Sequence, residues 1–131
     1  MNGTIESPFT ITWLELPAPC LTIADALDRA GIPYRYEFPA SIKGWGTLYP
    51  DFTCLDVRTR KEIIWEHFGL KGDTDYTENA LQKIAHYAAS GYILGKNLIA
   101  TFESGTTPLS AKQVQAYIKT IFKQDAHRQQ N

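Results

Sequence analysis

The sequence predicts an α/β fold, a mixed central sheet flanked by helices. Apolar residues recur at helical spacing in three segments, at residues 21–30, at residues 75–89 and from Ser110 onward. Three segments with strand character lie between the first two helices, and a fourth precedes the last helix. The element order is therefore α-β-β-β-α-β-α. In that order the third and last strands are parallel and joined through the second helix.

The length of 131 residues suits one domain, residues 1–131, with one core. Apolar residues make up 44% and charged residues 21%, an ordinary balance for a globular protein. The formal net charge of −1 gives no overall attraction to nucleic acid, so a polyanionic partner requires a local basic patch. Two terminal segments lie outside this core. Residues 1–19 are expected to be irregular, apart from one strand at residues 9–16 that ends at Pro17 and Pro19, and residues 123–131 form a polar tail.

No apolar run approaches the roughly 20 residues that span a membrane, so we expect no membrane partner. Residues 1–8 lack a basic start followed by an apolar stretch, which argues against a secretory signal. The two cysteines, Cys20 and Cys54, make neither a disulfide framework nor a metal-ligand cluster. We therefore expect a cytoplasmic protein with reduced thiols.

The first helix, residues 21–30, has start and stop signals. Thr22 and Asp25 have the spacing of a capping box. Gly31 suits the left-handed position after a helix, and Pro33 prevents its continuation. The apolar stripe consists of Ile23, Ala26, Leu27 and Ala30.

Four segments are expected to form strands: residues 34–38, 48–55, 62–68 and 97–102. Between the first two, "PASIKGWG" indicates a turn, and between the second and third, "DVRTRK" indicates a hairpin loop.

The second and third helices show apolar faces. The second ends at Gly91, and the third begins at Ser110, with Gln113 placed for a capping box. The apolar face of the second helix is expected at Ala80, Leu81, Ile84, Ala85 and Ala88. That of the third is expected at Val114, Tyr117, Ile118, Ile121 and Phe122.

Two carboxylates occur on strands that a short hairpin joins, Asp51 in "YPDF" and Glu66 in "WEHF". This connection brings them to one sheet position. Two adjacent buried carboxylates repel each other, and a divalent cation with oxygen ligands removes that repulsion. Such a cation lowers the pKa of bound water and neutralises charge on a phosphodiester. The alternative is that both acids lie at strand ends in solvent or pair with Arg or Lys.

One row of the second helix, spaced by 4, 3 and 4 residues, contains Tyr76, Ala80, Lys83 and Tyr87. If that row covers the sheet, Lys83 reaches the carboxylates and stabilises developing negative charge. Otherwise it is a surface lysine. The neighbour of Glu66, His67, has its side chain on the opposite face, so only its backbone carbonyl is placed to bind the same metal. The alternative for its side chain is a packed, hydrogen-bonded histidine.

Other chemistries find little support. The remaining histidines, His86 and His127, have no partner at zinc-binding spacing, and neither a phosphate-binding glycine loop nor a "GxSxG" motif is present. Basic and aromatic residues alternate at Lys43, Trp45 and Tyr49, which fits either a nucleic-acid contact or a covering loop.

Taken together, "YPDF…WEHFG…DYTENALQKIAHY" resembles the PD-(D/E)XK nuclease superfamily, and most closely the nuclease module appended to certain helicases. The resemblance covers about residues 34–102. It implies a restriction-endonuclease-like fold and an Mg²⁺- or Mn²⁺-dependent nuclease that hydrolyses DNA phosphodiester bonds. It also implies that Asp51 and Glu66 bind the metal together with the His67 carbonyl. Phe68 replaces the usual lysine two residues after the acid, and Lys83 matches the lysine that in this branch has moved to the following helix.

The chain departs from the family at the first helix, where the usual metal-binding glutamate is absent and Cys20 occupies about that position. Glu37 is a candidate substitute, and Tyr87 a candidate accessory residue. A degenerate, non-cutting module that binds nucleic acid or a protein partner is therefore the alternative function, and an unrelated α/β fold stays open as a third. Small nucleases of this size often work as homodimers. A nuclease further requires a basic rim around the acids, for which the candidates are Arg35, Lys43, Lys71, Lys83 and Lys96.

Overall fold

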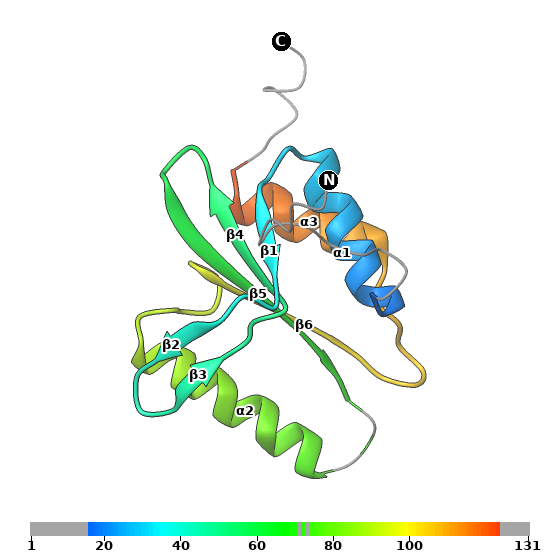
Figure 1. The fold of residues 1–131 in the computed structure, drawn as a ribbon. Helices are drawn as coiled ribbons and strands as arrows, with labels where there is room; N and C mark the ends of the chain where they lie inside the picture. Colours follow the sequence, from blue (N-terminus) through cyan, green and yellow to red (C-terminus); the bar gives the residue numbers. More distant parts are fainter. Residues whose placement is uncertain (1–15, 71, 73, 124–131) are drawn as a thin grey trace, which may run out of the picture.

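The computed structural model describes residues 16–70, 72 and 74–123. Figure 1 shows helices on both sides of a twisted central sheet. The elements in chain order are α1 (Ala18–Arg29), β1 (Tyr34–Tyr36), β2 (Ala40–Ile42), β3 (Gly46–Leu48), β4 (Phe52–Asp56), β5 (Lys61–Gly69), α2 (Thr74–Ala89), β6 (Leu98–Glu103) and α3 (Ala111–Ile121).

The central sheet has the order β1-β4-β5-β6. The first three strands pair antiparallel, with Phe52 opposite Trp65, and β5 pairs parallel with β6. Because α2 lies between β5 and β6 in the chain, it forms the crossover that parallel strands require. The predicted mixed sheet, with its third and last strands parallel, is confirmed.

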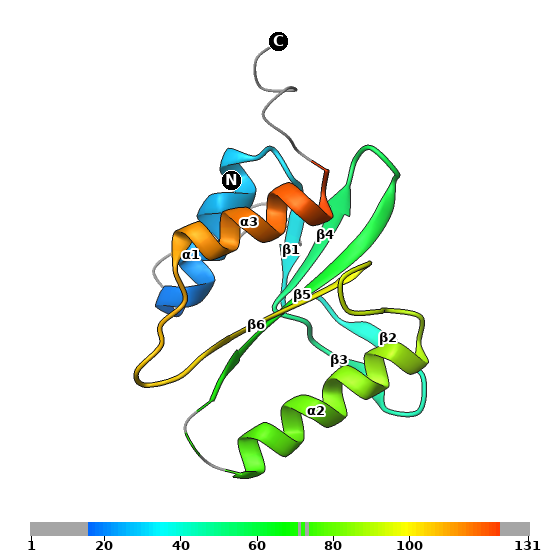
Figure 2. The same cartoon turned by 180° about the vertical axis from the view of Figure 1, so that it is seen from behind.

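Two layers cover the two faces of this sheet, as Figures 1 and 2 show from opposite sides. On one face, Phe52 and Trp65 pack against α1 and α3 in the larger core. On the other face, Ile64 and Leu98 pack against α2 and the β2–β3 hairpin. Successive strand residues alternate between these layers, so each position of β5 belongs to one of them.

The region before β4 differs from the prediction. Residues 48–55 were expected to form one strand, but β3 ends at Leu48 and β4 begins at Phe52. The break contains Pro50, and proline interrupts a strand because it has no amide hydrogen to donate to the neighbouring strand. The predicted turn "PASIKGWG" is instead most of the two-stranded β2–β3 hairpin, held by the burial of Ile42 and Leu48.

The first helix also begins earlier than predicted. It starts at Ala18, with Pro19 in its first turn, where a missing amide donor costs nothing. The expected capping box is therefore wrong: Thr22 lies inside the helix and donates to the Ala18 carbonyl at 3.2 Å, while Asp25 pairs with Arg29 at 2.6 Å. Gly31 has the predicted left-handed conformation, with φ of 72°.

The orientation of α2 corrects the predicted apolar face. Leu81, Ala85 and Ala88 are exposed, whereas Ala80 and Tyr87 are buried and Lys83 is half-buried. The row of Ala80, Lys83 and Tyr87 therefore covers the sheet, because Tyr87 fills more of the core than the small alanines would.

The remaining elements agree with the sequence. Ser110 caps α3 by accepting from the Gln113 amide at 3.1 Å, as predicted. The strand β6 is buried from Leu98 to Thr101. The expected strand at 9–16 lies, apart from Leu16, outside the described residues. Within the described residues, no helix has the length and apolar character needed to cross a membrane.

Candidate active site

Two acidic side chains meet at one position of the sheet. Asp51 directly precedes β4, and Glu66 lies in the paired strand β5, one residue beyond the partner of Phe52. The two carboxyl groups are close enough for each to shift the pKa of the other. Glu66 is only 2% exposed, and Asp51 is half-buried. The predicted meeting of the two acids is therefore found in the structure.

Backbone groups fix the orientation of Asp51. Its Oδ2 accepts a hydrogen bond of 2.8 Å from the amide of His67, and its carbonyl accepts one of 3.1 Å from the amide of Glu37. The carboxylate therefore does not depend on a flexible partner for its position.

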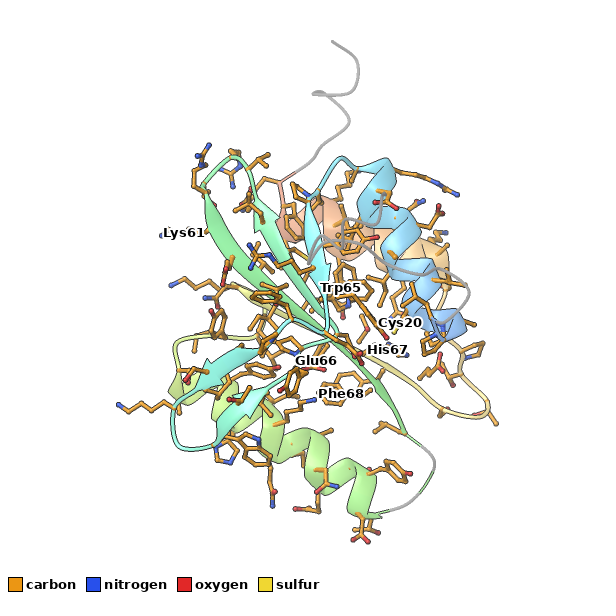
Figure 3. All side chains as sticks on the ribbon, viewed as in Figure 1. Cys20, Lys61, Trp65, Glu66, His67 and Phe68 are labelled. Carbon is orange, nitrogen blue, oxygen red and sulfur yellow. The ribbon has the colours of Figure 1, made fainter. Side chains whose placement is uncertain are left out.

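Two side chains of α2 converge on Glu66. Lys83 Nζ lies 3.2 Å from Glu66 Oε2, and the Tyr87 hydroxyl donates to the same oxygen at 2.5 Å. Because the two residues are one helical turn apart, both reach the same carboxylate. Lys83 is therefore not a free surface lysine. Figure 3 shows Glu66 on the side of the sheet that faces α2.

This environment shifts the pKa of both acids upward. Burial, followed by the negative charge of Asp51, raises the pKa of Glu66 to about 7, although Lys83 and Tyr87 oppose the shift. Burial also raises the pKa of Asp51, against the lowering effect of the His67 amide and the Lys83 charge. At neutral pH the metal-free pair is therefore poised to retain a proton.

The side chain of His67 lies on the other face, as predicted. Its Nδ1 is 2.8 Å from Thr101 Oγ1, which also accepts from Trp65 Nε1 at 3.2 Å. Among the described residues, His67 Nε2 has no hydrogen-bond partner, and Glu103 Oε1 lies 3.5 Å from it. The alternative of a packed, hydrogen-bonded histidine is therefore found. Its partner, Thr101, was not predicted; the signal for it is a polar residue within the apolar strand "NLIATF".

Cys20 lies near the acids without completing a three-carboxylate set. Burial, and then the charge of Asp51, raises the pKa of its thiol to about 11, against the lowering effect of the Tyr36 hydroxyl. The thiol is therefore neutral at pH 7. Glu37, the candidate substitute, is exposed and has a φ of 52°, and it contacts Asp51 through its backbone amide. Both cysteines are free and buried.

The donor set suits a hard cation. Within the residues that the structure describes, no group of three His, Cys, Asp or Glu side chains converges to hold a metal ion. The two carboxylates and the neighbouring His67 carbonyl still fit Mg²⁺, which commonly takes one or two carboxylates and completes its shell with water and phosphate.

The five candidates for the predicted basic rim lie in different settings, and the rim itself stays a prediction. Of its five candidates, Lys83 contacts the acids, the Arg35 guanidinium lies 4.3 Å from the centre of the Phe38 ring, and Lys71 falls outside the described residues. Lys43 and Lys96 are exposed.

Comparisons of the chain with protein-family models, with curated proteins and with solved structures found no match. The chemistry of the site is therefore inferred from its four polar side chains, which are Asp51, Glu66, Lys83 and Tyr87.

Proposed function

We propose that this protein is a metal-dependent nuclease that hydrolyses DNA phosphodiester bonds, with the active site at Asp51, Glu66 and Lys83. The observation that carries the proposal is the pair of the half-buried Asp51 and the buried Glu66, with Lys83 on the same Glu66 oxygen as Tyr87. A buried acid pair with one cation is unfavourable in the absence of a ligand, and a divalent cation relieves it. The element order of the central sheet and its helices, α-β-β-β-α-β-α, supports the proposed restriction-endonuclease-like fold.

Each residue has a distinct role in this proposal. Asp51, Glu66 and the carbonyl of His67 hold Mg²⁺ or Mn²⁺, with Asp51 fixed by the His67 amide. When bound, the cation supplies an acidified water and neutralises phosphate charge. Lys83, whose Nζ lies 3.2 Å from Glu66 Oε2, would be the residue to pair with the phosphate or to orient the attacking water. Tyr87 keeps Glu66 in place.

Isosteric variants test the proposal in a plasmid cleavage assay with Mg²⁺, Mn²⁺ or EDTA. Asp51→Asn and Glu66→Gln should each reduce cleavage about 100-fold or more, because they remove charge from the proposed metal site without removing volume. The matched control is Glu62→Gln, which alters an exposed glutamate on the same strand and the same face. Full cleavage by both site variants, with circular dichroism unchanged, would refute the proposal.

A second candidate function is a non-cutting binding module that retains the fold. The observation that favours it is Cys20, a neutral thiol beside the acids where the resembled family has a metal-binding glutamate. Metal binding distinguishes the two candidates. A nuclease should be stabilised by Mn²⁺ through Asp51 and Glu66, whereas failure of Mn²⁺ to raise the melting temperature, together with no cleavage, favours the binding module.

A further inference from the structure

We propose that the substrate of this site is a single-stranded nucleic acid, whose unpaired bases stack on exposed aromatic side chains around the Asp51–Glu66 pair. The inference rests on the proposed nuclease function and adds its substrate class. It is carried by the placement of the aromatic residues and by the distribution of the exposed aromatic surface.

Two aromatic positions flank the acids along the chain. Tyr49, 59% exposed, lies two residues before Asp51. On the other side, Phe68 lies two residues after Glu66 and therefore on the same face of β5. Phe68 stacks on Phe102 of β6 at 5.3 Å between ring centres, and Phe102 is 41% exposed. Figure 3 shows Phe68 close to Glu66 on the α2 side of the sheet.

A third position lies on the hairpin. Trp45, in the β2–β3 turn, has its ring centre 4.4 Å from that of His86 and is 47% exposed. His86 is the neighbour of Tyr87 in α2 and is three residues from Lys83. The hairpin thus does more than cover the core: Ile42 and Leu48 are buried beneath it, while its turn presents an indole to solvent.

The exposed aromatic residues are confined to one layer of the molecule. Within residues 16–70, 72 and 74–123, the large hydrophobic side chains with high exposure include four aromatic ones, Trp45, Tyr49, Tyr76 and Phe102. Trp45 lies in the hairpin turn, Tyr49 follows the hairpin, and Tyr76 belongs to α2. Phe102 lies on the face of β6 that α2 covers. Neither α1 nor α3 exposes a large hydrophobic residue. Aromatic surface therefore gathers on the side of the sheet that holds Glu66.

Base stacking favours unpaired over paired substrate. Lysine and arginine contacts to phosphate serve both kinds of substrate and therefore do not distinguish them. In a duplex the base faces are hidden by their neighbours, whereas a single strand offers them for stacking.

Binding can be measured without cleavage by fluorescence polarisation in EDTA. The probes are a labelled oligothymidylate of about 20 nucleotides and a duplex of the same length. We expect the full chain to bind the single strand at least tenfold more tightly. Equal or tighter binding of the duplex would overturn the inference.

Surface variants locate the contact. Trp45→Ala, Tyr49→Ala and Phe102→Leu should each weaken single-strand binding about fivefold or more, because each removes one stacking face. Phe102→Leu retains apolar bulk, so its loss of binding reports stacking. The control is Leu81→Ala, which removes a side chain of similar exposure, 57%, from another face of α2 and should bind as wild type does.

Three outcomes separate this inference from the proposed function. Metal-dependent cleavage of duplex plasmid alone, abolished in Glu66→Gln, upholds the nuclease and overturns the single-strand substrate. Single-strand binding that the aromatic variants weaken, without cleavage, upholds the nucleic-acid contact and overturns the nuclease. Wild-type binding by all three aromatic variants, with a change in oligomeric state by sedimentation, makes the aromatic surface a self-association interface and overturns the inference.

Discussion

Glu66 is the residue on which the site depends, because three other residues act on its ionisation. Burial and Asp51 raise its pKa to about 7, while Lys83 and the Tyr87 hydroxyl lower it. The result is a carboxyl group that holds a proton near neutral pH when no cation is bound. A metal ion must displace that proton, so Mn²⁺ affinity should increase as the pH rises through about 7.

The same shift predicts how stability depends on pH in EDTA. The pKa of Glu66 is about 7 in the folded chain, against 4.5 for an unperturbed glutamate. Between these values the folded state binds more protons than the unfolded state, so the free energy of unfolding decreases as the pH rises from about 4.5 to about 7. The expected decrease from this group is on the order of 3 kcal/mol. Urea unfolding of wild type and Glu66→Gln at several pH values measures it.

Glu66→Gln should lose most of this pH dependence, since an amide does not titrate, and should be the more stable protein at pH 8. Glu62→Gln, at an exposed position of the same strand, should keep the wild-type dependence. Identical slopes for wild type and Glu66→Gln between pH 5 and pH 7 would show that Glu66 titrates normally.

At the scale of the element, α2 shows why apolar periodicity misplaced a helix face. Leu81, Ala85 and Ala88 form a stripe by hydrophobicity, yet they are exposed. The neighbouring row packs on the sheet because Tyr87 fills the core with its ring and bonds Glu66 with its hydroxyl. Burying the tyrosine ring and satisfying a buried carboxylate stabilises the fold more than burying two alanine methyl groups would.

Two substitutions on this helix should therefore differ strongly. Tyr87→Ala should destabilise the protein by about 3–5 kcal/mol, because it leaves a cavity in the second core and removes one of the two partners of the buried Glu66 Oε2. Leu81→Ala should change stability by about 0.5 kcal/mol or less, because its side chain is 57% exposed. Chemical unfolding of both variants tests the assignment. Comparable losses in the two would mean that α2 presents the other face.

At the scale of the whole molecule, the sequence predicted what depends on local pattern. The strand–helix–strand unit from β5 to β6 and the cap at Ser110 follow from periodicity and capping chemistry. The hairpin between β1 and β4 was missed because its two strands have only three residues each, which is too short for an alternating pattern to show. A Lys–Gly–Trp turn joins them. The start of α1 was missed because Pro17 at the N-cap and Pro19 in the first turn resemble a break in the sequence.

The candidate site was predictable in its acids and less so in its surroundings. Asp51 and Glu66 follow from hairpin connectivity, and Lys83 and Tyr87 from one helix row. The contribution of α1 depends on how that helix packs on the sheet, which no local pattern encodes. That packing brings Cys20, 31 positions before Asp51 in the chain, close enough for the Asp51 charge to act on its thiol.

This packing leads to a prediction about metal affinity. The neutral thiol of Cys20 provides no carboxylate oxygen, so Cys20→Glu should add a third carboxylate beside Asp51 and Glu66. Without metal, the added buried charge should lower the melting temperature, since three carboxyl groups would share one cation, Lys83. With Mn²⁺, affinity should increase at least tenfold, because cation affinity rises with the number of charged oxygen ligands.

Calorimetric titration with Mn²⁺ measures this affinity directly. The control is Cys20→Gln, which has the same length without the charge. If Cys20→Glu binds Mn²⁺ no more tightly than Cys20→Gln, α1 does not face the metal position, and the acids of β4 and β5 must bind without it.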